Sequence, residues 1–438
     1  MTAKIESRFK PLFEPIKINK VKLKNRIVMG PMGLSVPTAE GAPSDQAIAF
    51  YEARARGGTG MIIISAAATA RSADEAPPTT PWLRWDIEEN VPKFQKLAEA
   101  IHAFETPVVI ELMSSFGRLG MPKTMNKIAA SPKELTIPED HFPKGFVIPG
   151  GITLSAPKAA TIEEIKEVEA GTIQAAERVF RAGFDGVEVN ANMSYFTSSF
   201  VIQRTNWRTD EYGGPLENRA RILINIVRGI RAVTSPDFII GLRIPANDFL
   251  PDGAKAVEFA TIAKIVEAEG IDYVALTYGA YETMDRSIPM KDGEMAESGD
   301  ARVFRKMLSV PIFIQGFHNP ELAAKAIAEG HGDVVMLARQ LLAEPNYVNK
   351  LQEGKTSQIV ACDRDQLCMR RMFYGLPVRC SMNPEMGREA RIRDGKRRPL
   401  KRYFQAPLEH LILLLTAKKW FMTPLMKIVR KILKKIGY

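Results

Sequence analysis

The sequence predicts a (β/α)8 barrel of the TIM type, followed by a small cysteine-bearing lobe and an amphipathic basic tail. Apolar runs of four to seven residues recur eight times, and segments with helical periodicity lie between them. Parallel strands that are buried on both faces have such continuous apolar runs, and eight strand–helix units close a barrel. A doubly wound open sheet is the alternative. No G-x-G-x-x-G follows the first apolar run, which disfavours that alternative.

The expected strands begin near residues 26, 60, 107, 185, 238, 272, 311 and 333. Helical periodicity is clearest over residues 162–183 and 216–234, and each segment ends near a glycine or a Ser-Pro break. Residues 113–160 interrupt the alternation with a Pro- and Gly-rich loop, in which FVIPGGITLS at 146–155 predicts a hairpin. The expected units are a barrel over 1–354, a cysteine lobe over 355–402 and a tail over 403–438.

Composition limits the classes of function. The chain has 438 residues and 45% hydrophobic content, which suffices for one large barrel with an appendage. Much of the net charge of +10 lies in residues 388–402 and in the last twenty residues, with no basic stripe interleaved with aromatics, so nucleic-acid binding is not expected. The N-terminus lacks the pattern of a secretion signal. Three cysteines between residues 362 and 380 suggest metal chemistry in a reducing cytoplasm.

The most informative stretch is 181–219, which joins the buried-strand pattern DGVEVN to a polar run that contains Tyr195. Its RTD-EYGG-x-x-x-NR segment resembles the Old Yellow Enzyme family of flavin-dependent ene-reductases, in particular the 2,4-dienoyl-CoA reductase and trimethylamine dehydrogenase branch. The resemblance covers roughly residues 10–390. It implies that the run follows the fourth strand of a barrel that binds FMN. Within the run, Arg208 and Asp210 are expected to pair with each other or with the backbone.

Candidate flavin ligands follow the apolar runs, because the reactive groups of a barrel lie at the C-terminal ends of its strands. Arg243 is a lone charge in the fifth run, and its burial is costly unless it meets an anion such as the N1–O2 edge of a reduced flavin. A structural ion pair is the alternative for Arg243. Barrels of this kind bind phosphate after the seventh and eighth runs, which favours FMN over FAD and makes Arg339 the best phosphate contact. Together with the resemblance, the expected cofactor-binding residues are Pro31, Met32, Gly33, Ala66, Glu111, Arg243, Gly316, Phe317, Ala338 and Arg339.

Two of these positions have a further interpretation. Glu111 stands where the resembled family usually has a glutamine. A glutamate can accept a hydrogen bond from the flavin N3–H, but it cannot donate one to O2 as an amide does. Gly33 can also serve simply as a turn residue.

The resemblance also implies a proton donor. Most members of the family hold the substrate carbonyl with a His-His or His-Asn pair, whereas this chain has Asn190 and Met193 at those places. The dienoyl-CoA reductases lack the pair and keep a tyrosine that corresponds to Tyr195, so Tyr195 is the expected donor of a proton to the substrate's α-carbon. A lid over the flavin is the alternative for Tyr195. Tyr281 either hydrogen-bonds the substrate or lines the pocket, and Arg204 is expected to hold an anionic group of the substrate.

The cysteine lobe resembles the iron–sulfur segment of the same branch, in which four cysteines hold a [4Fe–4S] cluster. Here Asp365 falls where the second cysteine is expected, which leaves Cys362, Cys368 and Cys380. Thiolates are the usual ligands of such clusters. Three interpretations remain open: a [4Fe–4S] cluster with Asp365 or solvent as fourth ligand, a [3Fe–4S] cluster, or a lobe without metal.

The tail alternates apolar residues with lysines at helical spacing and contains Trp420. Charge interrupts it too often for a bilayer span, so it is expected on an anionic membrane surface, packed on the barrel, or bound to an electron-donating partner. The expected location is cytoplasmic, with peripheral membrane contact through the tail. Larger relatives continue into a domain for FAD and nicotinamide, but no Gly-rich fingerprint occurs here. Electrons are therefore expected from an external reduced nicotinamide, flavin or ferredoxin-type protein.

The expected function is an FMN-dependent, iron–sulfur ene-reductase that acts on the C=C bond of an α,β-unsaturated carbonyl compound, such as an enoyl thioester or a steroid-like enone. An amine dehydrogenase or demethylase of the same fold is one alternative. A non-catalytic flavin-binding subunit is another, because Glu111, Asn190 and Met193 replace residues that the family usually has.

Overall fold

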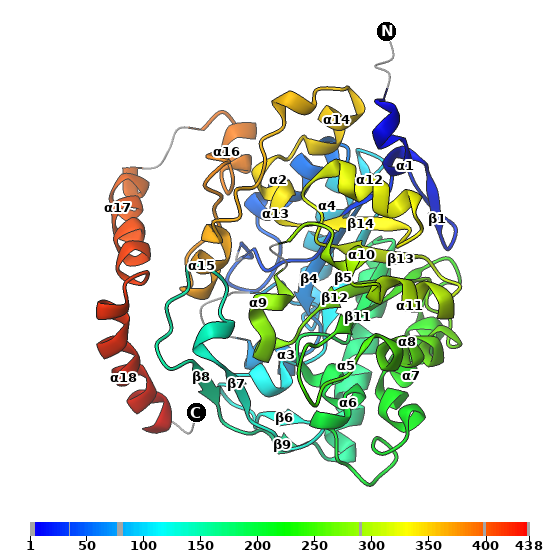
Figure 1. The fold of residues 1–438 in the computed structure, drawn as a ribbon, viewed down its shortest axis with the longest axis vertical. Helices are drawn as coiled ribbons and strands as arrows, with labels where there is room; N and C mark the ends of the chain where they lie inside the picture. Colours follow the sequence, from blue (N-terminus) through cyan, green and yellow to red (C-terminus); the bar gives the residue numbers. More distant parts are fainter. Residues whose placement is uncertain (1–4, 35, 77–81, 289–290, 397–399, 436–438) are drawn as a thin grey trace.

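Eight parallel strands close into a barrel at the centre of the chain (Figure 1). The computed structural model describes residues 5–34, 36–76, 82–288, 291–396 and 400–435. Each of the eight apolar runs forms one barrel strand, which confirms the predicted fold class. Around the barrel the order is β10-β11-β12-β13-β14-β3-β4-β5. The strands are β3 (Ile27–Met29), β4 (Met61–Ala67), β5 (Val108–Met113), β10 (Gly186–Asn190), β11 (Ile239–Asn247), β12 (Tyr273–Tyr278), β13 (Ile312–Gln315) and β14 (Val334–Leu337).

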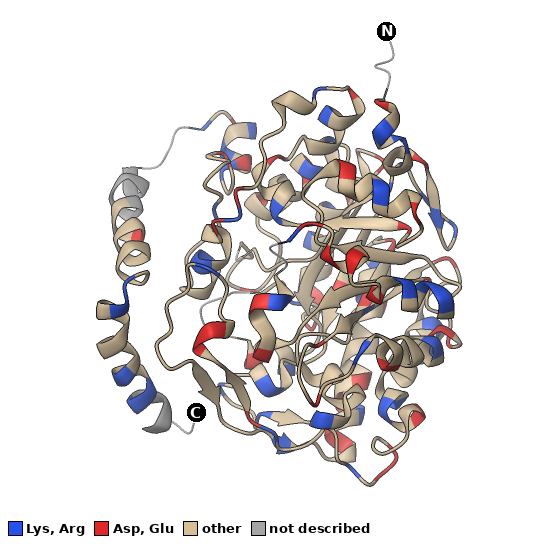
Figure 2. Ribbon diagram, viewed as in Figure 1, with Lys and Arg blue, Asp and Glu red and all other residues tan. Residues whose placement is uncertain are grey.

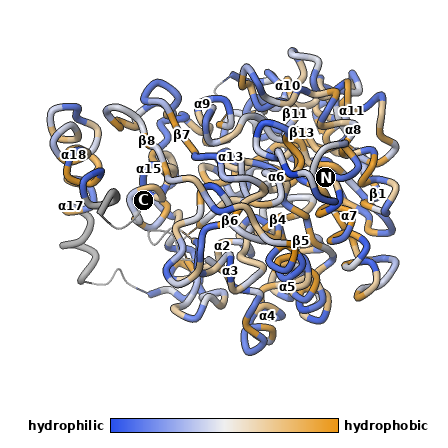
Figure 3. Tube along the Cα trace, turned by 90° about the horizontal axis from the view of Figure 1, so that it is seen from below, coloured by the Kyte–Doolittle hydropathy of each residue, from blue (hydrophilic) through white to orange (hydrophobic). Residues whose placement is uncertain are grey.

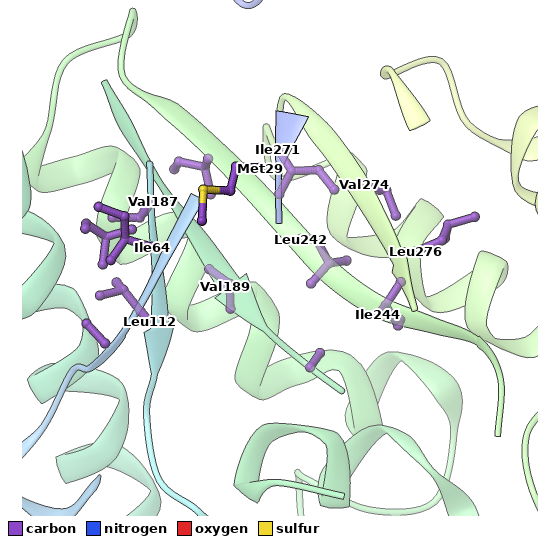
Figure 4. Close-up of a cluster of buried hydrophobic side chains, with 14 of the residues drawn as sticks. Met29, Ile64, Leu112, Val187, Val189, Leu242, Ile244, Ile271, Val274 and Leu276 are labelled. Atoms are coloured by element: carbon purple, nitrogen blue, oxygen red, sulfur yellow. The ribbon is translucent and has the colours of Figure 1, made fainter. Parts of the chain in front are cut away.

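Helices surround the barrel and bury the outward faces of its strands (Figures 1 and 4). The two clearest helical patterns form α5 and α7, and Thr161 begins α5 with a capping box in which its side chain and that of Glu164 exchange hydrogen bonds with the backbone. The longer helices are α2 (Asp45–Arg56), α4 (Val91–His102), α5 (Ile162–Arg181), α7 (Leu216–Val233), α8 (Ala256–Glu267), α11 (Asp300–Met307) and α12 (Pro320–Ala328). The shorter ones are α1 (Lys10–Phe13), α3 (Ala70–Glu75), α6 (Phe196–Val201), α9 (Met284–Ser287), α10 (Glu294–Glu297), α13 (Arg339–Ala343) and α14 (Tyr347–Gln352).

The barrel interior is closed at its N-terminal end. A hairpin of β1 (Ile16–Ile18) and β2 (Val21–Leu23) contributes Ile18 and Leu23 to the same buried cluster as Val28, Val109 and Phe313 near the starts of barrel strands. The opposite end is left for polar groups, as expected for an enzyme of this fold.

The long loop after β5 forms a cap with two small sheets. β7 (Leu135–Ile137) pairs antiparallel with β8 (Ile152–Leu154), and β6 (Ile128–Ala129) pairs parallel with β9 (Lys158–Ala159). The predicted hairpin at 146–155 is therefore wrong. Gly150 and Gly151 do turn the chain with positive φ, but the strand after the turn pairs with 135–137, and Phe146 and Ile148 pack in an apolar cluster instead.

The C-terminal part of the chain comprises α15 (Leu367–Phe373), α16 (Glu389–Arg393), α17 (Leu400–Leu415) and α18 (Lys419–Lys435). Helix α16 lies against α2, where Glu389 pairs with the buried Arg54 at 2.8 Å. Helices α17 and α18 run along one edge of the molecule, beside the cap (Figure 1). Within the described residues, no helix is long and apolar enough to cross a membrane. The boundaries at 354 and 402 stay predictions.

Candidate active site

Two tyrosines at the mouth of the barrel form the centre of the candidate site. Tyr195 follows β10 and Tyr281 follows β12, and their hydroxyl oxygens lie 2.7 Å apart in a hydrogen bond. Burial raises the pKa of Tyr281 to about 12 and the pKa of Tyr195 well above its usual value of 10. Both hydroxyls therefore keep their protons at neutral pH. Each hydroxyl is therefore a candidate proton donor.

The backbone that leads to Tyr195 is strained. Met193 and Ser194 have φ of 55° and 61°, in the left-handed region that residues other than glycine rarely adopt. Each such residue costs about 1 kcal/mol or more, so the surrounding contacts must hold it. The Ser194 hydroxyl donates to Glu282 Oε2 at 2.8 Å, and Glu282 follows Tyr281 in the chain. One buried carboxylate thus joins the segments that carry the two tyrosines.

Glu282 is also the centre of a buried charge cluster. Its Oε1 lies 2.6 Å from Arg118 Nη2 and 2.9 Å from Arg204 Nη1. Burial alone would raise the pKa of Glu282, but the two guanidinium groups outweigh it and lower the pKa. Arg204 also pairs with Asp252 at 3.1 Å. The predicted substrate cation thus has two carboxylate partners, and its role toward substrate stays a prediction.

A row of aromatic rings extends from the tyrosine pair along the cap side of the mouth. Ring centroids of Tyr281 and Tyr195 are 5.6 Å apart, those of Tyr195 and Phe116 are 5.6 Å apart, and those of Phe116 and Trp82 are 5.1 Å apart. All three contacts are edge-to-face, the arrangement that aromatic pairs favour. A flat apolar molecule is complementary to such a surface.

Arg243 lies inside the barrel between two carboxylates. Its Nε is 3.5 Å from Glu111 Oε1 and its Nη1 is 3.4 Å from Glu188 Oε1, both longer than an ordinary hydrogen bond. The alternative of a structural ion pair is therefore present in this structure. Asn190 donates to Glu111 at 2.7 Å and Tyr273 donates to Glu188 at 2.9 Å. Burial raises the pKa of Glu188 to about 7, so this carboxyl is partly protonated at neutral pH, and Glu111 is the second carboxylate beside Arg243.

A cationic cluster lies at the ends of β13 and β14. Arg364 Nη2 is 2.7 Å from Asp292 Oδ2, and His318 Nδ1 is 3.2 Å from Asp292 Oδ1. Arg339 and Arg364 act with burial to lower the pKa of His318, which places the three groups together and leaves the imidazole neutral at pH 7. Two guanidinium groups thus surround one carboxylate. The net positive charge is complementary to a phosphate group.

The other predicted cofactor residues lie around the same mouth. Met32 and Gly33 line a small hollow that Ser65 and Trp82 also line. Gly316 has φ of 92°, so only glycine fits there without strain. The remaining three positions contribute in different ways: Phe317 is buried, Ala338 directly precedes α13, and Ala66 packs in the core between barrel and helices. Pro31 is half-buried in the loop after β3.

The three cysteines lie close enough to influence one another electrostatically. Burial raises the pKa of the Cys362 thiol, with a smaller contribution from Cys380, and burial raises that of Cys368 to about 12. Burial raises the pKa of Cys380, and Asp365 adds a smaller contribution in the same direction. In the described part of the chain, no group of three or more His, Cys, Asp or Glu side chains is arranged to hold a metal ion. Metal ligation by Cys362, Cys368, Cys380 and Asp365 stays a prediction.

Several residues of the mouth were not expected from the sequence: Glu282, Arg118, Trp82, Phe116, Arg364, His318 and Asp292. Each of these residues contributes to the site through a contact between segments that are distant in the sequence. Local sequence patterns do not predict such contacts. The expected pairing of Arg208 with Asp210 is confirmed, with 2.5 Å between Nη2 and Oδ2.

The fold and this mouth are those of a flavin oxidoreductase, and the chain belongs to the NADH:flavin oxidoreductase / NADH oxidase family, whose model matches residues 11–358. This confirms the resemblance found in the sequence. FMN is the flavin of this family. The positive charge around Arg339 and Arg364 fits its phosphate, and the buried guanidinium group of Arg243 fits the electron-rich edge of its ring.

Individual relatives have different functions. A metal reductase of Desulforamulus reducens is 32% identical over 383 residues, which are 87% of this chain and 54% of that protein. A cinnamate reductase of Clostridium sporogenes is 32% identical over 407 residues, 88% of this chain and 59% of that protein. A solved 2-naphthoyl-CoA reductase is 29% identical with a TM-score of 0.78, covering 87% of this chain and 58% of that one. The chain thus spans a little over half the length of these relatives.

Proposed function

We propose that this protein is an FMN-dependent ene-reductase that acts on the C=C bond of an α,β-unsaturated carbonyl compound. The observation that carries the proposal is the hydrogen bond between the Tyr195 and Tyr281 hydroxyls, both protonated at neutral pH. Reduction of an activated alkene needs a hydride at the β-carbon and a proton at the α-carbon. FMN, when bound, supplies the hydride.

The tyrosine pair supplies the proton. Transfer of the Tyr195 proton to the α-carbon leaves a phenolate, which the hydrogen bond from Tyr281 stabilises at the moment the charge forms. The strained turn at Met193 and Ser194, held by Glu282, orients Tyr195 toward the mouth. Tyr281 serves in the same step as partner of Tyr195. Solvent restores the lost proton after product leaves.

The cofactor is held at two places. Arg339 and Arg364 bind the phosphate, together with the loop at Gly316 and Phe317 and the residue Ala338. Arg243 and Glu111 face the ring's polar edge, and Pro31, Met32 and Gly33 line its other side together with the backbone of Ala66 in β4. Support comes from the net positive charge of the first place and the burial of Arg243 in the second. Electrons come from a reduced nicotinamide, flavin or ferredoxin-type carrier.

The aromatic row supports a planar, apolar substrate. An aryl or polyene enoyl group can pack against Phe116 and Trp82 while its carbonyl end lies near the tyrosines. The reductases of cinnamate and 2-naphthoyl-CoA among the similar proteins act on compounds of this shape. Arg204 holds an anionic group of the substrate when it exchanges its exposed partner Asp252 for that group.

The same aromatic row favours a second function, oxidation of an amine. An alkylammonium group binds the faces of aromatic rings by cation–π interaction, and the row contains a tryptophan and two tyrosines. This function needs no proton donor, which ranks it below alkene reduction.

An iron–sulfur cluster in the cysteine lobe is part of the proposal. Its support is the spacing of Cys362, Cys368 and Cys380 and their mutual electrostatic influence. Among the residues that the structure describes, no group of three or more His, Cys, Asp or Glu side chains is already arranged to hold a metal ion. Iron analysis of anaerobically prepared protein tests this part, with Asp365→Cys as the matched variant. An iron content below about one per chain in both proteins contradicts it.

The main function is tested by the visible spectrum of the purified protein. We expect flavin bands that an electron donor bleaches and that a cinnamoyl or similar enoyl compound restores under anaerobic conditions. If an alkylamine bleaches the bands and an enoyl compound does not restore them, the second function is correct. Flavin bands that respond to neither an enoyl compound nor an alkylamine indicate the non-catalytic flavin-binding alternative, and a protein that takes up no FMN contradicts the proposal.

A further inference from the structure

The last two helices expose apolar side chains in an unusual concentration. Half or more of the surface of Leu408, Leu411, Leu414, Trp420 and Ile428 is exposed, and Trp420 reaches 70%. These five side chains, which we call the outer face, lie within 21 residues of α17 and α18. Contiguous exposed apolar side chains on a water-soluble surface usually mark a binding site.

The opposite face of the same helices is fixed to the protein. Met422 and Met426 are buried in a cluster with Phe146 and Ile148 of the cap. Arg371 pairs with Glu409 at 2.5 Å, and Arg430 donates to the Gly151 carbonyl at 2.7 Å. The exposed outer face is therefore not the face that these contacts hold against the protein. Both helices lie along one edge of the molecule (Figures 1 and 3).

Cations flank the outer face. Residues 403–438 contain seven Lys or Arg and a single acidic residue, Glu409, which is taken by Arg371. Lys427 and Lys431 on α18 and Lys418 just before it are exposed, and basic residues occur along this part of the chain in Figure 2. Helices that lie in a membrane interface combine tryptophan, leucine and lysine on their exposed surface in this way.

We propose that the outer face of α17 and α18 binds the surface of an anionic lipid bilayer, with the helices lying in the plane of the interface. Trp420 and the leucines enter the headgroup region, and Lys418, Lys427 and Lys431 contact acidic headgroups. Charge complementarity favours this occupant, because a protein partner would more often present its own carboxylates to some of these lysines and aromatic pockets to Trp420, whereas a bilayer matches both features at once.

The location of this face also matters for the site. The apolar cluster that anchors α18 includes Tyr281 on its border. A bilayer under α17 and α18 would thus lie beside the cap that covers the mouth. An apolar substrate of the proposed class would be concentrated in the same bilayer, although binding to lipid does not depend on the proposed function.

The test is flotation of the full-length protein with vesicles of phosphatidylcholine alone and vesicles that contain phosphatidylglycerol. We expect binding to the anionic vesicles that weakens with added salt, because surface charges are screened. Lys427→Glu should lower the partition coefficient about five-fold or more, from the contribution of one basic residue near an anionic surface. Trp420→Glu, which also removes an inserted ring, should lower it further.

Val257→Glu on α8 is the matched control, since Val257 is 63% exposed and lies on the barrel. It should bind vesicles as the unaltered protein does. Equal binding of the unaltered protein and Trp420→Glu overturns the proposal, as does equal binding to neutral and anionic vesicles. A dimer in light scattering that Trp420→Glu dissociates, with no vesicle binding, also overturns it and assigns the face to a second copy of the chain. The flavin content of the same preparation is measured separately. Absence of vesicle binding by a protein that contains FMN contradicts the membrane proposal alone, whereas absence of FMN contradicts the proposed function.

Discussion

The mouth of the barrel has two unlike halves. The half after β10 and β12 contains neutral tyrosine hydroxyls and aromatic rings, with the charges of Glu282, Arg118 and Arg204 buried behind them. The half after β13 and β14 contains Arg339 and Arg364 around one carboxylate. One half can give up a proton at neutral pH and the other can hold an anion. The difference indicates separate duties for catalysis and for cofactor binding, which substitutions should separate.

The largest expected effect comes from the tyrosine half. Tyr195→Phe should lower the rate of alkene reduction about 10²–10⁴-fold, the usual contribution of a positioned acid. The FMN content should stay the same. Steady-state rates and flavin absorbance of the same preparation check both. Because the two hydroxyls share a hydrogen bond, Tyr195→Phe/Tyr281→Phe should lose less than the product of the two single losses. Multiplicative losses would show that the tyrosines act separately.

The buried charges behind the tyrosines should matter mainly for stability. Glu282→Gln leaves Arg118 and Arg204 without their shared carboxylate, which should lower the free energy of unfolding by about 3–5 kcal/mol. Chemical denaturation checks this. The matched control is Glu321→Gln, which removes the exposed ion pair with Arg8 and should cost less than about 1 kcal/mol. Similar losses in the two variants would contradict the structural role of Glu282.

The cationic half should respond in cofactor affinity. Arg339→Ala should weaken FMN binding about 10–100-fold, the range of one hydrogen bond to a charged group. Arg364→Ala should act in the same direction, and Arg302→Ala, which removes a guanidinium on α11, is the control. Flavin fluorescence during titration of the apoprotein measures all three. If Arg339→Ala and Arg364→Ala both bind FMN with wild-type affinity, the assignment of the FMN phosphate to this half of the mouth is wrong.

The smallest effect concerns the carboxyl between the halves. Glu188 has a pKa of about 7 in the folded chain and near 4.5 when unfolded. Between these values the folded state binds more protons, so stability falls as pH rises from about 4.5 to 7. Glu188→Gln should lack this fall in stability with rising pH. The difference between its melting temperature and that of wild type should therefore change between about pH 4.5 and pH 7. Parallel profiles would contradict the raised pKa.

A control for this pH effect is Glu88→Gln. Arg181 and Arg178 hold the pKa of Glu88 at about 2, so its carboxyl is ionised in both states above about pH 5.5. Its contribution to stability is lost only as pH falls toward 2. Between pH 5.5 and 8 the melting temperature of Glu88→Gln should stay parallel to that of wild type.

The sequence predicted the fold best where the same local pattern recurs along the chain. Continuous apolar runs located all eight strands, because each barrel strand is buried on both faces and needs no distant partner to be recognised. Tyr195 and Tyr281 each follow a barrel strand in the sequence, and this position alone predicted that both lie at the same rim of the barrel. The pairing of 135–137 with 152–154 could not be found this way, because it depends on which distant segment accepts the strand. Glu282 and Arg364 were missed for the same reason.

The tail shows which structural feature periodicity predicts and which it does not. Its helical spacing of leucines and lysines predicted an amphipathic helix, and the structure has two, α17 and α18. Periodicity alone could not say which face would pack on the protein. Met422 and Met426 face the cap, whereas Trp420 stays outside, and only the tertiary contacts separate them.

The most direct test of the two-halves account is anaerobic stopped-flow mixing of FMN-saturated, pre-reduced protein with an enoyl compound. Tyr195→Phe should be slow to regain its flavin absorbance, although its bound FMN is complete and its reduction by the electron donor is normal. Arg339→Ala, once saturated with FMN, should regain absorbance at the wild-type rate per bound flavin. The account is contradicted if Tyr195→Phe matches wild type in this step, or if Arg339→Ala is slowed as much as Tyr195→Phe.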